Sequence, residues 1–330
     1  MRISLKNFII PSIPLAVFLV GCCFVLWLSA YVGTTYTAIS TQNTTIVEDL
    51  QSIFLHSSLL LNLVCIALTL LNGFLVAQIN NRFTIIRVRT FLPILIFLML
   101  IGSWSLTHIM IGSHLALTLF ILALFYFFSM SRDRKASEQA FMGSLLISIS
   151  SILINQLLFV IPVCWIGFIM FQSFSLRTFM ASVFGVLSPW ILYLSGMYFF
   201  YPGFDIYKLI NLSTNIDFNY LTLSLSEILY MAVIGIIMVI SIVGMYSVIN
   251  SDAIKTRNKL NFILFLLIFL LVLSFVYKDQ FISFLPFIAF VYSMLISHPL
   301  TLKQNNFYGI LFIIFCLINI AFVISKYFIL

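Results

Sequence analysis

Long apolar runs alternate with short polar connections along almost the whole chain. Runs of about 20 apolar residues are typical of transmembrane helices, whereas the strands of a membrane barrel alternate apolar and polar residues. The pattern therefore predicts an all-α fold, a polytopic transmembrane helix bundle. The clearest predicted spans are Phe8–Tyr31, Ile53–Ile79, Phe91–Met110, His114–Met130, Phe179–Tyr201, Glu227–Ile249, Leu260–Tyr277, Phe281–Ser297 and Phe307–Phe328.

The apolar stretch Ala140–Phe174 decides the number of spans. As a single helix it would be about 52 Å long, which is too long for a hydrocarbon core of about 30 Å. The polar pair Asn155–Gln156 at its centre predicts a break, after which the chain returns to the side from which it came. The two halves are either two short spans or a re-entrant hairpin. We therefore predict about eleven spans, or nine spans plus a re-entrant hairpin.

Charge sets the predicted orientation. The 330 residues are 63% hydrophobic and 8% charged, with a mean hydropathy of +1.19. If the N-terminus is cytoplasmic, thirteen of the sixteen Lys and Arg residues fall in cytoplasmic segments, and only Lys208, Lys278 and Lys326 fall outside. Cytoplasmic loops of membrane proteins are enriched in Lys and Arg. The charges thus predict a cytoplasmic N-terminus, an external C-terminus and a single transmembrane domain over residues 1–330 with no soluble domain.

Composition and motifs also exclude several classes of function. The net charge of +7 is explained by the cytoplasmic loops, so no nucleic-acid partner is predicted. The five cysteines all lie in apolar runs without metal-ligand spacing, so no metal site and no cofactor are predicted. No Asp, Glu, Lys or Arg lies near the middle of a predicted span, which disfavours an ion-coupled pump. No recognisable catalytic motif occurs.

One candidate site is the external acidic pair Glu48 and Asp49, with His56 seven residues after Asp49. If a helix starts near Glu48, Asp49 and His56 share one face. A carboxylate there could act as a general base or hold a divalent cation. The alternative is a solvated loop end whose acids favour a helix N-terminus. The histidines His108 and His114 are also predicted to be external and could converge with His56, although their spacing matches no metal motif.

A second candidate site is the set of basic residues in two cytoplasmic connections. Arginine side chains bind phosphate through two parallel hydrogen bonds, so six cations at the headgroup level could hold a lipid phosphate or a pyrophosphate. The alternative is that these residues only fix the topology. The set comprises Arg82, Arg87, Arg89, Arg132, Arg134 and Lys135.

The segment from Leu71 to Pro189 shows a family resemblance. It contains Asn80-Asn-Arg-Phe-Thr-Ile-Ile-Arg-Val-Arg-Thr-Phe-Leu-Pro93, then Ala140-Phe-Met-Gly143, then Arg177, Gly185 and Pro189. This arrangement is similar to that of an uncharacterised family of polytopic inner-membrane proteins from Bacteroidota. The Arg-x-Arg-Thr-x-Leu-Pro piece is its specific part. The resemblance implies a bacterial envelope setting and assigns no reaction.

Three hypotheses for function follow from the sequence. The first is a multi-pass protein of the bacterial inner (plasma) membrane that serves the cell envelope and binds a partner membrane protein or a lipid-linked substrate. The second is a membrane-embedded glycosyltransferase or glycan polymerase that uses a polyprenyl-phosphate sugar, with Glu48, Asp49 and His56 as catalytic residues and a divalent cation as cofactor. The third is a transporter or flippase. The partners expected in each case are membrane lipids, a second membrane protein or a polyprenyl-linked glycan.

Overall fold

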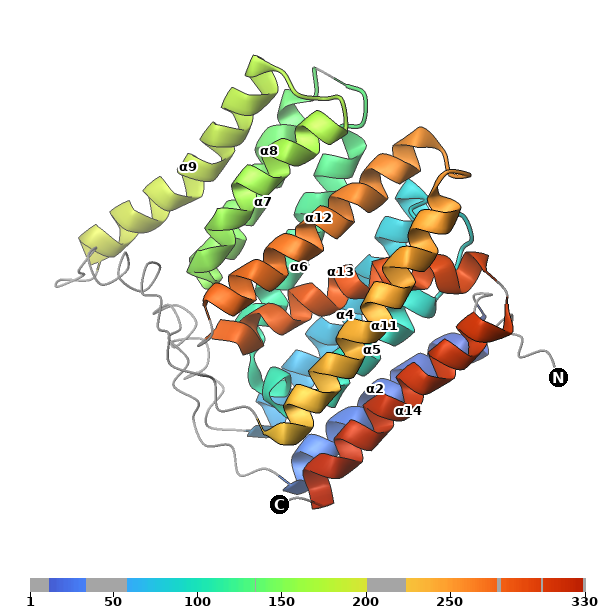
Figure 1. Cartoon of the computed structure of the whole chain (residues 1–330). Helices are drawn as coiled ribbons and strands as arrows, with labels where there is room; N and C mark the ends of the chain where they lie inside the picture. The colour runs from blue at the N-terminus through green and yellow to red at the C-terminus, as the bar shows by residue number, and fades with distance from the viewer. Residues whose placement is uncertain are drawn as a thin grey trace.

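A computed structural model describes residues 12–33, 58–133, 135–200, 224–277, 280–303 and 305–328. Within these ranges the chain forms eleven α-helices and two 3-10 helices and no strand, which confirms the predicted all-α class (Figure 1). The helices are α2 (Ile13–Gly33), α4 (Ser58–Phe83), α5 (Leu92–Ser103), α6 (Ile111–Ser129), α7 (Ser137–Leu153), α8 (Ile161–Met170), α9 (Leu176–Phe200), α11 (Leu225–Ile249), α12 (Ile254–Val276), α13 (Phe281–Leu302) and α14 (Asn306–Phe328), with the 3-10 helices η1 (Ser105–Ile109) and η2 (Asn155–Val160).

Seven of these helices are long and apolar enough to cross a membrane, namely α4, α6, α9, α11, α12, α13 and α14. Three shorter apolar helical segments, within Pro14–Trp27, Leu92–Ser103 and Asn155–Met170, accompany them. In hydrocarbon every backbone polar group needs a partner inside the protein, and a helix supplies all of them locally. The chain thus has the helices of a membrane protein, and the count of eleven spans stays a prediction.

The predicted break in the stretch 140–174 is confirmed. Helix α7 ends at Leu153, Ile154 is extended, and η2 begins at Asn155. The backbone N–H of Arg132, before α7, donates to the carbonyl of Phe171, after α8, at 3.0 Å. Because the two ends of the stretch lie together, α7 and α8 run in opposite directions (Figure 1).

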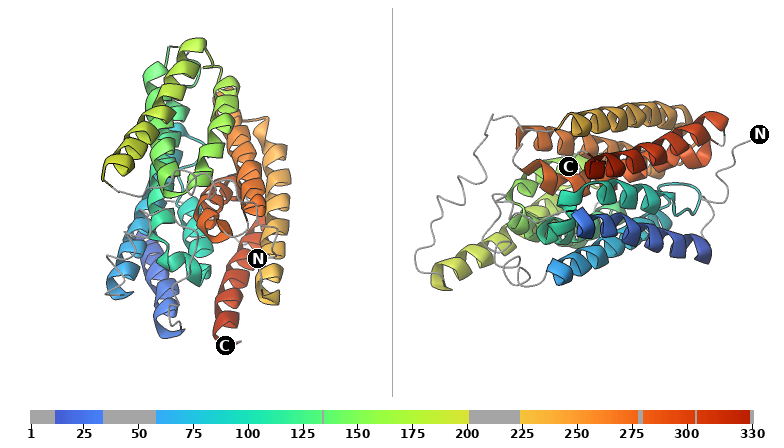
Figure 2. Two further views of the ribbon diagram at one scale, coloured as in Figure 1. Left: turned by 90° about the vertical axis from the view of Figure 1, so that its left-hand side faces the viewer. Right: turned by 90° about the horizontal axis from the view of Figure 1, so that it is seen from below.

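Basic residues gather at one end of the bundle, which we call the basic end. It is formed by residues 84–91, 130–133, 171–175, 250–253 and 303, whereas residues 104–110 and 154–160 lie at the far end (Figures 1 and 2). All the Lys and Arg side chains that the structure describes belong to the basic end. They are Arg82, Arg87, Arg89, Arg132, Lys135, Arg177, Lys255, Arg257, Lys259 and Lys303. The predicted grouping of these ten residues is therefore observed, and the side of the membrane on which they lie stays a prediction.

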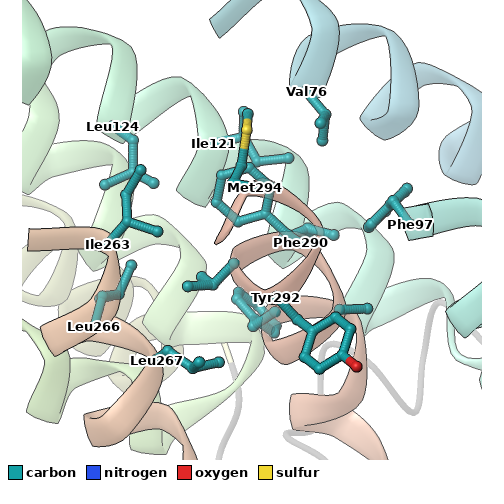
Figure 3. Close-up of a cluster of buried hydrophobic side chains, with 14 of the residues drawn as sticks. Val76, Phe97, Ile121, Leu124, Ile263, Leu266, Leu267, Phe290, Tyr292 and Met294 are labelled. Atoms are coloured by element: carbon teal, nitrogen blue, oxygen red, sulfur yellow. The ribbon is translucent and has the colours of Figure 1, made fainter. Parts of the chain in front are cut away.

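Helix α13 forms the centre of the core. Its most apolar 18-residue window is 78% buried, against 11% for that of the peripheral helix α9. Figure 3 shows Phe290 and Met294 of α13 among side chains of α4, α5, α6 and α12, including Phe97 and Ile121. The neighbouring helices α4, α5, α6 and α12 therefore pack against apolar side chains of α13.

Small residues allow α7 and α9 to approach closely. A Cβ atom added to Gly185 of α9 would lie 2.5 Å from the backbone oxygen of Phe141. The Ser148 hydroxyl donates to the Val186 carbonyl at 2.7 Å, and the Trp190 indole N–H donates to the Ser151 hydroxyl at 3.0 Å. Small residues and interhelical hydrogen bonds are the usual means of helix association in membranes, and here they attach α9 to the bundle.

We expect Gly185→Ala to lower the free energy of unfolding by about 1–3 kcal/mol, because overpacking against a backbone atom cannot be relieved by a side-chain rotation. Gly196 on the same helix is the matched control, since a Cβ atom there meets nothing within 4 Å. Gly196→Ala should be neutral or slightly stabilising, as Ala favours helix. Denaturant unfolding of both variants in one detergent measures the difference. Equal effects would contradict the close contact.

Candidate functional site

The structure describes most of the basic candidate site and none of the acidic one. Glu48, Asp49, His56 and Arg134 lie outside the described residues, so the acidic candidate site stays a prediction. Of the basic set, Arg82 ends α4, Arg87 and Arg89 follow in the connection to α5, and Arg132 and Lys135 precede α7. Arg87 and Arg82 have different surroundings: Arg87 binds Asp252, whereas Arg82 lines a groove between α4, α6 and α7.

The connection between α4 and α5 has a defined conformation. Thr84 adopts a positive φ of 47°, which turns the chain out of α4. The side-chain oxygen of Asn80 then accepts a hydrogen bond from the backbone N–H of Ile86 at 2.8 Å. Ile85 and Ile86 are both buried. With its apolar neighbours inside the protein, the connection presents Arg87 to the turn between α11 and α12.

Arg87 belongs to a polar cluster at the basic end that we call the Asp252 cluster. Its members are Arg87, Ser251, Asp252 and His298. Asp252 Oδ1 accepts from Arg87 Nε, and Asp252 Oδ2 lies 3.0 Å from His298 Nε2. Arg87 Nη2 also donates to the Ser251 hydroxyl at 2.8 Å. The side chains of Asp252 and His298 are fully buried, while that of Arg87 is 41% exposed.

Further contacts join the start of α12 to the end of α4. Lys259 Nζ donates to the carbonyl of Phe83 at 3.4 Å and lies 4.9 Å from the centroid of the Phe83 ring. The Thr256 hydroxyl donates to the carbonyl of Thr84 at 3.3 Å. A cation near the last carbonyls of a helix complements the helix dipole. The basic end of α4 is thus held by α12 as well as by the Asp252 cluster.

The Asp252 cluster connects three parts of the chain: the α4–α5 connection, the α11–α12 turn and the last part of α13. Both carboxylate oxygens of Asp252 have partners within the cluster. The cluster therefore connects helices and is not an open ligand site. Sequence reasoning missed Asp252 and His298 as partners of Arg87. The one available signal was that Asp252 is one of only three acidic residues, with Asp133 and Glu138, among the basic connections.

We expect Asp252→Ala to lower the free energy of unfolding by about 2–3 kcal/mol, because it leaves the buried His298 and the half-buried Arg87 without their acceptor. Asp133→Ala is the control at the same end, since Asp133 is exposed and accepts a hydrogen bond only from the Lys135 backbone among described residues. Its cost should stay within about 1 kcal/mol. Thermal unfolding in detergent compares the stabilities of the two variants. Similar losses of stability would show that Asp252 does not hold these helices together.

His108 and His114, two of the three histidines considered as a possible converging set, lie together at the far end. Trp27 stacks on His108 with ring centroids 4.1 Å apart, and its ring lies 6.3 Å from that of His114. His114 Nε2 contacts the carbonyl of Thr107 at 3.0 Å. The rings of His108 and His114 are buried. No group of three His, Cys, Asp or Glu residues that could hold a metal occurs in the described ranges.

An apolar crevice lies in the half of the bundle nearer the far end. Its volume is 220 Å³, several times the about 30 Å³ that one water occupies in the liquid. Helices α5, α11, α12 and α13 all contribute to its wall, and α11 and α12 flank α13 in Figure 1. Representative lining residues are Leu100, Trp104, Ile234, Gly235, Leu271 and Leu285. We call this cavity the crevice.

The two tyrosines of the crevice use their hydroxyls elsewhere. Tyr230 donates to the side-chain oxygen of Asn319 at 2.9 Å, and Tyr292 donates to the carbonyl of Ile234 at 2.9 Å. Tyr230 also stacks on Phe322, with centroids 4.1 Å apart. Because both hydroxyls have partners, the rings present carbon to the cavity. The crevice therefore suits a hydrocarbon group and offers little to a polar ligand.

Comparisons with known proteins assign no function to these residues. No model of a known protein family matches the chain, and no curated protein or solved structure gives a match.

Proposed function

We propose that this protein is a multi-pass membrane protein that binds the hydrocarbon chain of a membrane lipid or of a lipid-linked substrate in the crevice. The observation that carries the proposal is the apolar lining of a cavity between helices long enough to span a membrane. Such a cavity would stay dry in a membrane, and an acyl or prenyl chain is the apolar ligand present there in excess. Because lipid tails are as apolar as this lining, the chain would be held there by van der Waals packing rather than by transfer from water.

The position of the crevice also supports this proposal. Helices α11 and α12 both pack on α13, and the crevice is lined from all three. The outer surfaces of α11 and α12 carry exposed apolar side chains, among them Ile236 and Val239 on α11 and Ile268 and Val272 on α12. A lipid chain beside these helices would need to cross no polar surface to enter. We propose that the membrane is the bacterial inner membrane, as the sequence predicts.

The other hypotheses gain less from the structure. The glycosyltransferase hypothesis depends on Glu48, Asp49 and His56, which lie outside the described residues. A polyprenyl-linked substrate would use the crevice in either case, so the two hypotheses share the same first step. For the transporter or flippase hypothesis, the apolar lining of the crevice offers no path to a polar solute. We therefore favour lipid binding over transport.

The crevice can be tested by filling it from Gly235 of α11. A Cβ atom added to Gly235 meets nothing within 4 Å, so Gly235→Phe places a ring in the cavity without a backbone clash. With the protein in nanodiscs that contain a phospholipid bearing a diazirine in its acyl chain, the wild type should form crosslinks at Met231, Met238 and Leu271. We expect Gly235→Phe to reduce this crosslinking about tenfold or more.

Gly196→Phe is the matched control for the crevice test. Gly196 also has open space at its Cβ position, but it lies on α9, away from the crevice. The control should crosslink as the wild type does. Crosslinks at the three crevice positions that persist in Gly235→Phe, or that never form in the wild type, would contradict the proposal.

The predicted orientation has its own test. Fusions of a fluorescent reporter that matures only in the cytoplasm should fluoresce when made after residue 133, at the basic end, and stay dark when made after residue 107, at the far end. The physical reason is the concentration of Lys and Arg at one end of the bundle. The reverse pattern would show that the basic end faces outwards.

A further inference from the structure

A second cavity lies at the basic end, on a different part of the bundle from the crevice. It has a volume of 450 Å³ and is lined by residues of α4, α6 and α7. The charged residue of its lining is Arg82, in the last turn of α4. Its other polar residues are Gln78, Tyr126, Ser129 and Gln139. We call this cavity the Arg82 groove.

The groove is polar at one end and apolar towards the middle of the bundle. Ser129 is the last residue of α6 and Leu122 lies seven residues earlier on the same helix face, about 10 Å further from the basic end at 1.5 Å per residue. Phe125, the other apolar residue of the lining, lies between Leu122 and Ser129 along the axis of α6. Hydrogen-bonding groups thus meet at the helix ends, and hydrocarbon continues inwards along α6.

Arg82 keeps its guanidinium available for a ligand. Within the described part of the chain, its contact is with the ring of Phe83, 5.6 Å from the centroid, and its side chain forms no ion pair or hydrogen bond there. Arg87 is different, because its Nε–H and one Nη2–H are already used by Asp252 and Ser251. Arg82 has no such partner in the described part of the chain, so either planar pair of its donors can face a phosphate.

We propose that the Arg82 groove binds the phosphate of a phospholipid headgroup, with the start of an acyl chain along Leu122 and Phe125. Arg82 would bind two phosphate oxygens, and the Tyr126 hydroxyl and the amides of Gln78 and Gln139 would donate to the headgroup. The Ser129 hydroxyl already donates to the Tyr126 carbonyl at 2.6 Å, so it would only accept. The apolar part of the groove favours a lipid over free phosphate. The Arg82 groove and the crevice share no helix, so this proposal is independent of the proposed function.

Native mass spectrometry of the delipidated full-length protein, titrated with phosphatidylglycerol, tests the proposal. We expect Arg82→Gln to weaken binding about tenfold, as loss of one charge-assisted pair implies. The affinity of Arg82→Lys for the lipid should lie between those of the wild type and Arg82→Gln, because lysine keeps the charge but lacks the planar guanidinium. Arg82 is exposed, so the unfolding temperature of both variants should match the wild type. Dioleoylglycerol, which lacks the phosphate, should show no dependence on Arg82.

The control variant is Arg89→Gln, which removes an exposed arginine from the same end without touching the groove. It should bind phosphatidylglycerol within about twofold of the wild type. Equal losses in the Arg82 and Arg89 variants would overturn the site in favour of general charge attraction. Unchanged binding in Arg82→Gln would overturn it outright. Displacement of the lipid by millimolar inorganic phosphate, dependent on Arg82, would overturn the assignment to a lipid.

Discussion

The absence of water from the hydrocarbon core of a membrane is the main constraint on this structure. A polar group placed there must find its hydrogen-bond partner within the protein. The helices satisfy their own backbones, and many of the buried side chains follow the same rule. Serine and threonine hydroxyls bond to carbonyls one turn back, as Thr301 does to Ser297 at 2.9 Å, or to a neighbouring helix, as Ser148 does to Val186. The described Lys and Arg side chains lie at one end, and the single buried carboxylate described in this chain, that of Asp252, has a partner for each oxygen.

Much of the fold was predictable because hydrophobic length and local polarity determine it. The break at Asn155 could be predicted since a helix across the whole stretch could not fit a bilayer, and the contact of Arg132 with Phe171 shows the return of the chain. The grouping of basic residues at one end followed from the alternation of the spans. Helix ends moved by a few residues, as for α12, which begins at Ile254 rather than near Leu260.

The sites were less predictable because they depend on pairs of residues far apart in the sequence. Arg87 and Asp252 are separated by 165 positions, and no local pattern indicates that they meet. The crevice is built from ordinary apolar residues of four helices, each of which resembles core in the sequence. Arg82 could be selected as a cation, but the sequence did not distinguish it from Arg87. Only the packing shows that one arginine is committed to a carboxylate and the other faces a groove.

The Asp252 cluster fixes the turn between α11 and α12, and from that turn the two helices diverge on either side of α13 (Figure 1). They therefore form a V with its vertex at residues 250–253 and its open arms at the crevice. Tyr230 is about 28 Å along α11 from the vertex at 1.5 Å per residue. A rotation of α11 by about 5° at the vertex would thus move Tyr230 by about 2–3 Å. A change of angle at the vertex, where the Asp252 cluster lies, would therefore change the width of the crevice near the other end of the molecule.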